Sequence, residues 1–128
     1  MSNEFTVSSL LKIDKNFMTD TKQVSNLKIS QTGDGAIGGV QNIGTAAEAI
    51  DMGDVSTPGL CWFRNLAAAG GNYVQIGMDV GGAGFEEFIR LLGGETAGPF
   101  RLDMVATGVL QAKADTGAIE LQYVIYEE

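Results

Sequence analysis

Apolar and polar residues alternate along much of this chain with a period of two, and that period indicates half-buried β-strands. The first alternating stretch covers residues 5–13, and a second covers residues 23–31. A weaker strand is predicted around residues 36–42. One face of the first stretch carries Phe5, Val7, Ser9, Leu11 and Ile13. The first third of the chain is therefore expected to form strands, and the first of them has a largely apolar face.

The alternation is sharper in the second half of the chain. Strands are predicted at residues 60–66, 73–79, 85–92, 100–104 and 119–126. The first two of these flank a glycine-containing turn, so we expect them to pair as a β-hairpin. In residues 85–92 the apolar positions follow a helical spacing. Eight residues between glycine clusters are short for a helix, so a strand is predicted there as well.

These elements predict an all-β fold, an antiparallel β-sandwich or jelly roll of about eight short strands. A length of 128 residues suits a single domain over residues 1–128. The 18 glycines fit many short elements joined by tight turns. Residues 32–44 are rich in glycine and form the expected long loop.

The formal net charge of the chain is −8, from 16 acidic and 8 basic residues. Such a surface repels the phosphates of nucleic acids and anionic membranes, so we expect neither as a partner. No stretch reaches 18 consecutive apolar residues, which argues against a membrane-spanning helix. The N-terminal residues have an acid where a signal peptide has basic and then apolar residues. We therefore expect synthesis in a cytoplasm without Sec-type export.

The chain contains no histidine and one cysteine, Cys61. Ser-His-Asp and Cys-His catalysis and His-ligated metal centres are therefore excluded within one chain. Cys61 stands between Leu60 and Trp62, so we expect a buried thiol that acts as a small apolar side chain. We predict no enzymatic activity, no catalytic residue, no cofactor and no metal site. Neighbouring acids such as Asp51 and Asp54 leave open a calcium ion at an interface between chains.

Residues 33–38 match the G-x-G-x-x-G pattern of dinucleotide-binding loops. That mechanism requires a helix directly after the loop, because the helix N-terminus holds the pyrophosphate. The following residues, Gly-Val-Gln-Asn-Ile-Gly over 39–44, are poor helix formers. A chance match is also easy in a chain with 18 glycines. We interpret residues 33–38 as a turn-rich loop.

Three large side chains are candidates for binding a partner. If Cys61 and Phe63 face the core, alternation turns Leu60, Trp62 and Arg64 outward on the predicted hairpin. The same argument turns Tyr73 outward on the second strand of that hairpin. Trp, Tyr and Arg are the residue types enriched at binding hot spots, and an outward Trp and Tyr could also stack on a sugar. The reverse assignment, with Trp62 in the core, is equally compatible with the pattern.

The role of the first 20 residues stays open at this stage. Phe17 and Met18 lie between polar residues. That pattern is compatible with packing on the chain's own domain and with extension to a neighbouring chain.

An ordered series of short motifs occupies the second half of the chain. The series is Trp62-Phe63-Arg64-Asn65-Leu66, Asn72-Tyr73-Val74-Gln75-Ile76-Gly77-Met78-Asp79, Gly94-Glu95, Leu110-Gln111-Ala112-Lys113-Ala114-Asp115-Thr116 and Glu120-Leu121-Gln122-Tyr123. It resembles a pattern in small virion-associated proteins of tailed phages. The resemblance covers residues 58–128, and the first half of the chain matches no family pattern. The segment Phe85-Glu86-Glu87-Phe88 departs from that pattern, in which a Pro-containing aromatic strand is common.

The resemblance implies a β-sandwich that assembles into a virion and performs no catalysis. The expected function is that of a capsid decoration, or cement, protein that self-associates, with a trimer as one candidate form. Its partners would be copies of itself and the major capsid protein or other virion proteins, in a particle made in the host bacterial cytoplasm. Edge strands and residues 32–44 are the expected docking elements. The alternatives are a tail, neck or fibre-associated virion protein and a carbohydrate-binding module that uses Trp62 and Tyr73.

Overall fold

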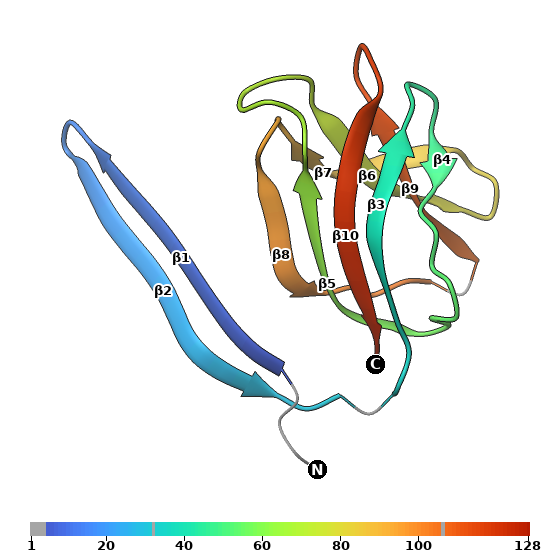
Figure 1. The fold of residues 1–128 in the computed structure, drawn as a ribbon, viewed down its shortest axis with the longest axis horizontal. Coiled ribbons are helices and arrows are strands. Elements are labelled where there is room, and N and C mark those ends of the chain that lie inside the picture. The colour runs from blue at the N-terminus through green and yellow to red at the C-terminus, as the bar shows by residue number, and fades with distance from the viewer. Residues whose placement is uncertain (1–4, 32, 106) are drawn as a thin grey trace. The chain divides into compact units, whose positions relative to one another are not determined.

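The computed structural model describes residues 5–31, 33–105 and 107–128, and these residues form strands and no helix (Figure 1). The strands are β1 (Phe5–Lys15), β2 (Met18–Ile29), β3 (Ala36–Ile43), β4 (Glu48–Ala49), β5 (Pro58–Asn65), β6 (Val74–Val80), β7 (Phe85–Leu91), β8 (Thr96–Arg101), β9 (Gly108–Ala114) and β10 (Ile119–Glu127). The described ranges hold no helix long and apolar enough to cross a membrane. Residues 1–4, used for the export prediction, and Thr32 of the expected loop lie outside the described residues.

By its internal contacts the chain divides into two units, residues 1–32 and residues 33–128. In the first unit β1 and β2 pair with each other as an antiparallel hairpin and form their own two-stranded sheet. In the second unit eight strands form two four-stranded sheets. We expected one domain over residues 1–128, and all the strands of the sandwich lie within residues 33–128.

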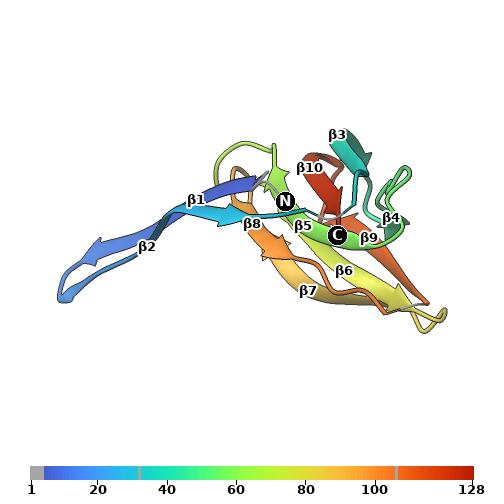
Figure 2. The same ribbon diagram turned by 90° about the horizontal axis from the view of Figure 1, so that it is seen from below.

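The eight strands of the second unit have the nested pairing of a jelly roll. One sheet has the order β3-β10-β5-β8, and the other has the order β4-β9-β6-β7 (Figure 2). The first strand of this unit pairs with its last, the second with the second last, and so on inward to the β6–β7 hairpin. The chain is thus one long hairpin folded across two sheets, as in jelly-roll domains. The predicted all-β sandwich is confirmed.

The core lies between the two sheets and is formed by side chains at alternate strand positions. Ile119, Leu121, Tyr123 and Ile125 of β10 are all buried, which confirms that they share one inward face. They meet buried residues from both sheets, namely Ile43, Cys61, Phe63, Val74, Ile76, Leu91, Leu110, Ala112 and Ala114. The hydroxyl of Tyr123 donates a hydrogen bond to the carbonyl oxygen of Asp51 at 2.9 Å, so its polar end is satisfied.

The structure confirms some of the predicted elements and corrects others. Residues 85–91 form strand β7, as expected, because a short apolar run between glycine turns pairs with β6. The predicted hairpin of residues 60–66 and 73–79 is wrong, since β5 and β6 belong to different sheets. The expected long loop is wrong over residues 36–43, which form β3 as the weaker prediction proposed. The strand predicted at residues 100–104 lies earlier, at Thr96–Arg101.

Candidate functional site

The β1–β2 hairpin has one apolar face and one polar face. Directly opposed residues of an antiparallel pair share a face, so the register assigns each side chain to one of the two. Val7 opposes Leu27, and Ser9 opposes Val24. The large apolar residues on that side define the apolar hairpin face: Phe5, Val7, Leu11, Ile13, Met18, Val24, Leu27 and Ile29. Ser9, Lys15, Asp20 and Lys22 lie on the same side of the hairpin. The opposite face carries Thr6, Ser8, Leu10, Lys12, Asp14, Thr19, Thr21, Gln23 and Lys28.

Most of the apolar hairpin face is exposed. Leu11 is 72% exposed and Met18 is 56% exposed, and Val24 and Leu27 are nearly half exposed. The described residues of this unit form two strands and supply no second layer that could cover the face. A two-stranded hairpin is only marginally stable in water, and a contiguous exposed apolar surface marks an interaction site. The hairpin therefore has the properties of an element that is stabilised by a partner.

The turn of the hairpin presents an aromatic ring to solvent. Asn16 and Phe17 connect Lys15 to its opposed residue Met18. Asn16 adopts a φ of 53°, a left-handed conformation that asparagine tolerates better than most residues. Phe17 is fully exposed at the end of this turn. We refer to Asn16 and Phe17 as the hairpin turn.

The two units carry opposite charge. Residues 1–32 contain four lysines and three acids, whereas residues 33–128 contain four basic residues and thirteen acids. Half of the basic residues of the chain are therefore in the hairpin unit, namely Lys12, Lys15, Lys22 and Lys28. Lys22 forms a surface pair with Asp20 at 3.1 Å, and Lys28 donates a hydrogen bond to the hydroxyl oxygen of Thr6 at 2.6 Å. The sandwich is strongly acidic and the hairpin is slightly basic.

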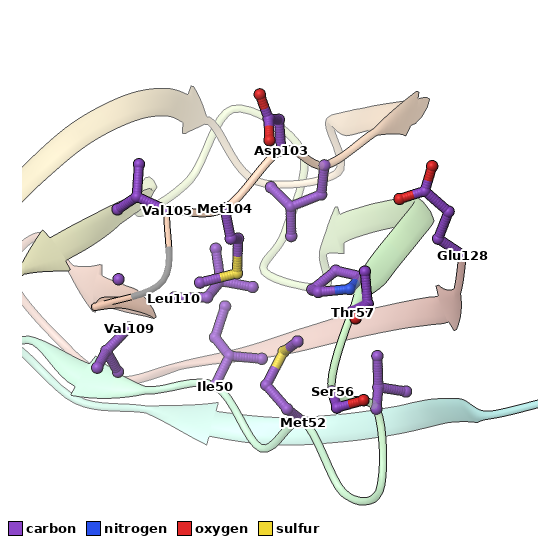
Figure 3. A pocket seen from close by; sticks show the side chains of 14 residues that line it. Ile50, Met52, Ser56, Thr57, Asp103, Met104, Val105, Val109, Leu110 and Glu128 are labelled. Atoms are coloured by element: carbon purple, nitrogen blue, oxygen red, sulfur yellow. The ribbon is translucent and has the colours of Figure 1, made fainter. Parts of the chain in front are cut away.

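The sandwich contains a pocket of about 510 Å³ at the end where the chain terminates (Figure 3). Its walls come from the β4–β5 loop, the β8–β9 loop, the start of β9 and the C-terminal residue. Ile50, Met52, Met104 and Leu110 supply apolar lining, and the two methionine side chains point toward one another across the space. We call this space the end pocket. Its volume lies in the range of pockets that enclose small ligands.

Hydrogen bonds hold the β4–β5 wall of the end pocket in place. The side-chain amide of Gln41 donates to the carbonyl oxygen of Ala49 at 2.9 Å and its oxygen accepts from the Asp51 amide at 3.0 Å. Ser56 donates its hydroxyl proton to the carboxylate of Glu127 at 2.8 Å. This hydrogen bond is the main reason that the pKa of Glu127 is lowered. The pocket wall is therefore fixed by contacts of the folded chain itself.

The rim of the end pocket is acidic. Asp103 and Glu128 lie at its edge in Figure 3. The segments that form its walls, residues 50–58, 101–110 and 127–128, contain five acids and one base. That base, Arg101, pairs with Glu128 at 3.6 Å between two half-exposed side chains. An apolar interior with an acidic rim suits an apolar group that carries basic neighbours.

The structure brings two of the three predicted partner-binding residues together. Cys61 and Phe63 are buried, so Trp62 and Arg64 lie on the outer face of the β3-β10-β5-β8 sheet, which decides between the two assignments that the alternation left open. Leu60 is buried, so the expectation that it faces outward is wrong. Tyr73 directly precedes the buried Val74 of β6 and so faces outward from the other sheet. Trp62 and Tyr73 therefore lie on opposite outer faces and do not form one stacking platform.

Tyr73 belongs to a polar cluster on its own sheet. The guanidinium of Arg90 lies 4.4 Å from the centre of the Tyr73 ring and donates to both carboxylate oxygens of Glu87, at 2.7 and 3.1 Å. The hydrogen bond to Arg90 lowers the pKa of Glu87, and a hydrogen bond to Asp115 raises the pKa of Tyr73. Through these contacts the polar groups of Glu87 and Arg90 on β7 bind each other and the neighbouring Tyr73 ring. The cluster therefore stabilises this edge of the sandwich.

Three further chemical possibilities raised by the sequence are a reactive Cys61, a dinucleotide-binding loop at residues 33–38 and a metal site. Cys61 is buried, as predicted, and burial raises the pKa of its thiol to about 12. Residues 36–43 after the glycine-rich motif form a strand, so they lack the helix that a dinucleotide loop requires. Within the described ranges, no group of three or more acidic, cysteine or histidine side chains is placed to hold a metal ion.

Several motif residues of the second half stabilise loops at the end of the sandwich away from the end pocket. The buried Asn65 side chain donates to the carbonyl oxygens of Asn72 and Leu91 and accepts from the Ala67 amide. The Asn72 side chain accepts from the Thr116 amide at 3.1 Å and donates to the Gly117 carbonyl oxygen. Glu95 accepts from the Leu92 amide at 2.6 Å. The sequence pattern that carries the phage resemblance therefore has a folding role in this chain.

Comparison with family models, with curated proteins and with solved structures finds no match to this chain.

Proposed function

We propose that this chain is a structural component of a tailed-phage particle, and in the first place a decoration protein that self-associates and docks on the head lattice. The observation that carries the proposal is the uncovered apolar hairpin face. A folded sandwich that holds an amphipathic hairpin without a second layer has the form of an assembly protein. The phage-like motif series of residues 58–128 supports the same class of protein.

The physical driving force for assembly is the burial of the apolar hairpin face. Fully burying one large apolar side chain stabilises a complex by about 1.5–3 kcal/mol, before the cost of association is subtracted. Five of the eight residues on the face are exposed, namely Leu11, Ile13, Met18, Val24 and Leu27, so one hairpin supplies apolar surface for a stable contact. Repetition of that contact around a symmetric particle adds avidity without any new interaction.

The sandwich supplies the rigid frame of this assembly. Jelly rolls occur in viral capsid and lectin domains, and the fold by itself does not determine which role a chain has. A tail, neck or fibre position is the alternative within the particle. The carbohydrate-binding alternative relied on Trp62 and Tyr73, and their positions on opposite outer faces do not favour it.

Two neighbouring leucines provide a matched test of the proposal in particles of the phage that encodes this chain. Leu11 lies on the apolar hairpin face and is 72% exposed, whereas Leu10 lies on the polar face and is 63% exposed. We expect Leu11→Ser to reduce the amount of the protein in purified particles about tenfold, because one apolar contact is lost at every copy. We expect Leu10→Ser to leave it within about twofold of the wild type. Quantitative mass spectrometry of the particles measures both.

The same measurement separates the head from the tail. A copy number close to that of the major capsid protein supports a head decoration protein, and a few copies per particle support a tail or neck position. Absence of the wild-type chain from purified particles would rule out the proposed function. Equal incorporation of the two serine variants would show that the apolar hairpin face does not mediate docking.

A further inference from the structure

The hairpin turn and the end pocket are complementary in polarity. Phe17 is fully exposed, and Met18 beside it is more than half exposed. The end pocket offers an apolar lining of Ile50, Met52 and Leu110, and its volume of about 510 Å³ can enclose an aromatic side chain. Large apolar side chains at a loop tip are commonly buried on binding, because their exposure to water is unfavourable.

The two features are also complementary in charge. Lys15 adjoins the hairpin turn, and over residues 12–22 the three lysines outnumber two acids, Asp14 and Asp20, of which Asp20 pairs with Lys22 at 3.1 Å. The end pocket is surrounded by wall segments with five acids and one base. Opposite charges at the rim of an apolar contact steer association and set its orientation. A lysine-flanked aromatic turn is therefore a suitable occupant of an acid-rimmed pocket.

The hairpin is long enough to place its turn on another molecule. From Met18 to Ile29 strand β2 has 12 residues, which corresponds to about 36 Å at the usual rise per residue. The strands of the sandwich contain at most 9 residues. The distance from the base of the hairpin to its turn is therefore greater than the length of any strand of the sandwich.

We propose that the hairpin turn of one copy occupies the end pocket of a second copy of this chain. Phe17 enters the apolar interior, and Lys15 lies near the carboxylates of Asp103 and Glu128. This inference rests on the proposed function, because it names the partner of the hairpin in the assembly. The turn and the pocket are different surfaces, so each copy both donates and accepts a contact. Such a contact is heterologous, and it closes into a ring, for example of three copies, or extends as a chain.

One variant for each side of the contact tests the proposal on the purified full-length chain. Phe17→Ser removes the ring of the turn and leaves the pocket intact. Val105→Lys places a positive charge in the wall of the end pocket, at a side chain that is 54% exposed. Val40→Lys is the matched control, because Val40 is 55% exposed on β3 and does not line the pocket. Sedimentation velocity over a concentration series gives the mass of each species.

A heterologous contact makes a specific prediction for these variants. The wild type and Val40→Lys form oligomers. For each of the two contact variants alone, the dissociation constant for self-association is about tenfold or more above that of the wild type. A mixture of Phe17→Ser and Val105→Lys forms a dimer and no larger species, because one intact turn meets one intact pocket. The dissociation constant of this dimer rises with salt, since the rim contacts are ionic.

Several outcomes would overturn the inference. A monomeric wild type, undiminished self-association of Phe17→Ser, or a mixture that stays monomeric each excludes this contact between copies. A monomeric wild type that binds isolated capsids would assign the hairpin to a capsid partner, keep the docking part of the proposed function and reject its self-association. Self-association as described, together with absence from purified particles, would keep the contact and reject the proposed function.

Discussion

Asn65 is the buried polar side chain of the described core, and its position shows how a single residue supports the fold. Its amide group donates to the carbonyl oxygens of Asn72 at 2.9 Å and Leu91 at 3.0 Å, and its oxygen accepts from the Ala67 amide at 2.9 Å. These three bonds join the end of β5 to the β5–β6 loop and to the end of β7. A buried amide is stable in an apolar interior when its hydrogen-bonding groups are satisfied in this way.

Replacement of Asn65 by Ala should destabilise the sandwich. The substitution leaves two carbonyl groups and one amide of the backbone without their partner, and we expect a loss of about 3 kcal/mol in the free energy of unfolding. Urea denaturation followed by tryptophan fluorescence measures this loss. Asn42→Ala is the control, because Asn42 is exposed on β3, and its effect should stay below about 0.5 kcal/mol. Similar values for the two variants would contradict the structural role of Asn65.

Cys61 should be unreactive in the folded chain. Burial raises its thiol pKa from 9.0 to about 12, so the reactive thiolate is about a thousandfold rarer in the folded state than in the unfolded state near pH 8. We expect alkylation at pH 8 to be at least that much slower in buffer than in denaturing urea, as measured by mass spectrometry. Because the folded pKa is the higher one, the contribution of the neutral thiol to stability is complete below pH 9. It is lost as the pH rises from 9 toward 12. Equal alkylation rates in the two conditions would show that the thiol is accessible.

At the scale of elements, the two kinds of strand differ in how they are stabilised. β10 lies between β3 and β5, and every second side chain from Ile119 to Ile125 is buried in the core. β1 and β2 have one neighbour each in their own sheet, and most of their large apolar side chains are exposed. The local stability of a segment follows its buried apolar contacts and its hydrogen-bonded neighbours. The hairpin is therefore the least stable paired element on its own.

Amide hydrogen exchange should resolve this difference. In a dilute, dissociated sample we expect the β1 and β2 amides to exchange at least about a hundredfold faster than the paired amides of β10, because the hairpin opens without disrupting the core. Raising the concentration until the chain self-associates should slow exchange in β1 and β2 and leave β10 unchanged. Mass spectrometry of peptic peptides measures both segments in one experiment. Protection of the hairpin equal to that of β10 in the dilute sample would show that another surface already covers it.

At the scale of the whole molecule, polarity and charge are divided between two units. The sandwich carries thirteen of the 16 acids, and the hairpin unit carries half of the 8 basic residues. Net negative charge keeps free copies soluble and apart, and a basic element on each copy provides a directed attraction that salt can weaken. This division of charge supports the proposal, made from the exposed apolar hairpin face, that the hairpin forms contacts between molecules.

Much of the fold was predictable from the local pattern, and the pairing was not. The alternation from Ile119 to Ile125 correctly indicated the inward face of β10, whereas that of Cys61 and Phe63 with Trp62 left two assignments open until the fold decided between them. The expectation that residues 60–66 and 73–79 form a hairpin failed, because the strands of a jelly roll cross between sheets and β5 pairs with β8 and β10 instead. Strand partners that are distant in sequence leave no signal in a local periodicity.

The sequence by itself determined the all-β class, the inward face of β10, the buried thiol of Cys61 and the acidic character of the molecule. Each of these depends on residue type and on the period of two along one strand. The tertiary structure alone decided that β1 and β2 have no second layer in their unit, that Trp62 and Tyr73 lie on opposite faces, and that two distant loops form the end pocket. These features depend on which strands become neighbours, and strand partners that are distant in sequence leave no mark on the pattern within one strand.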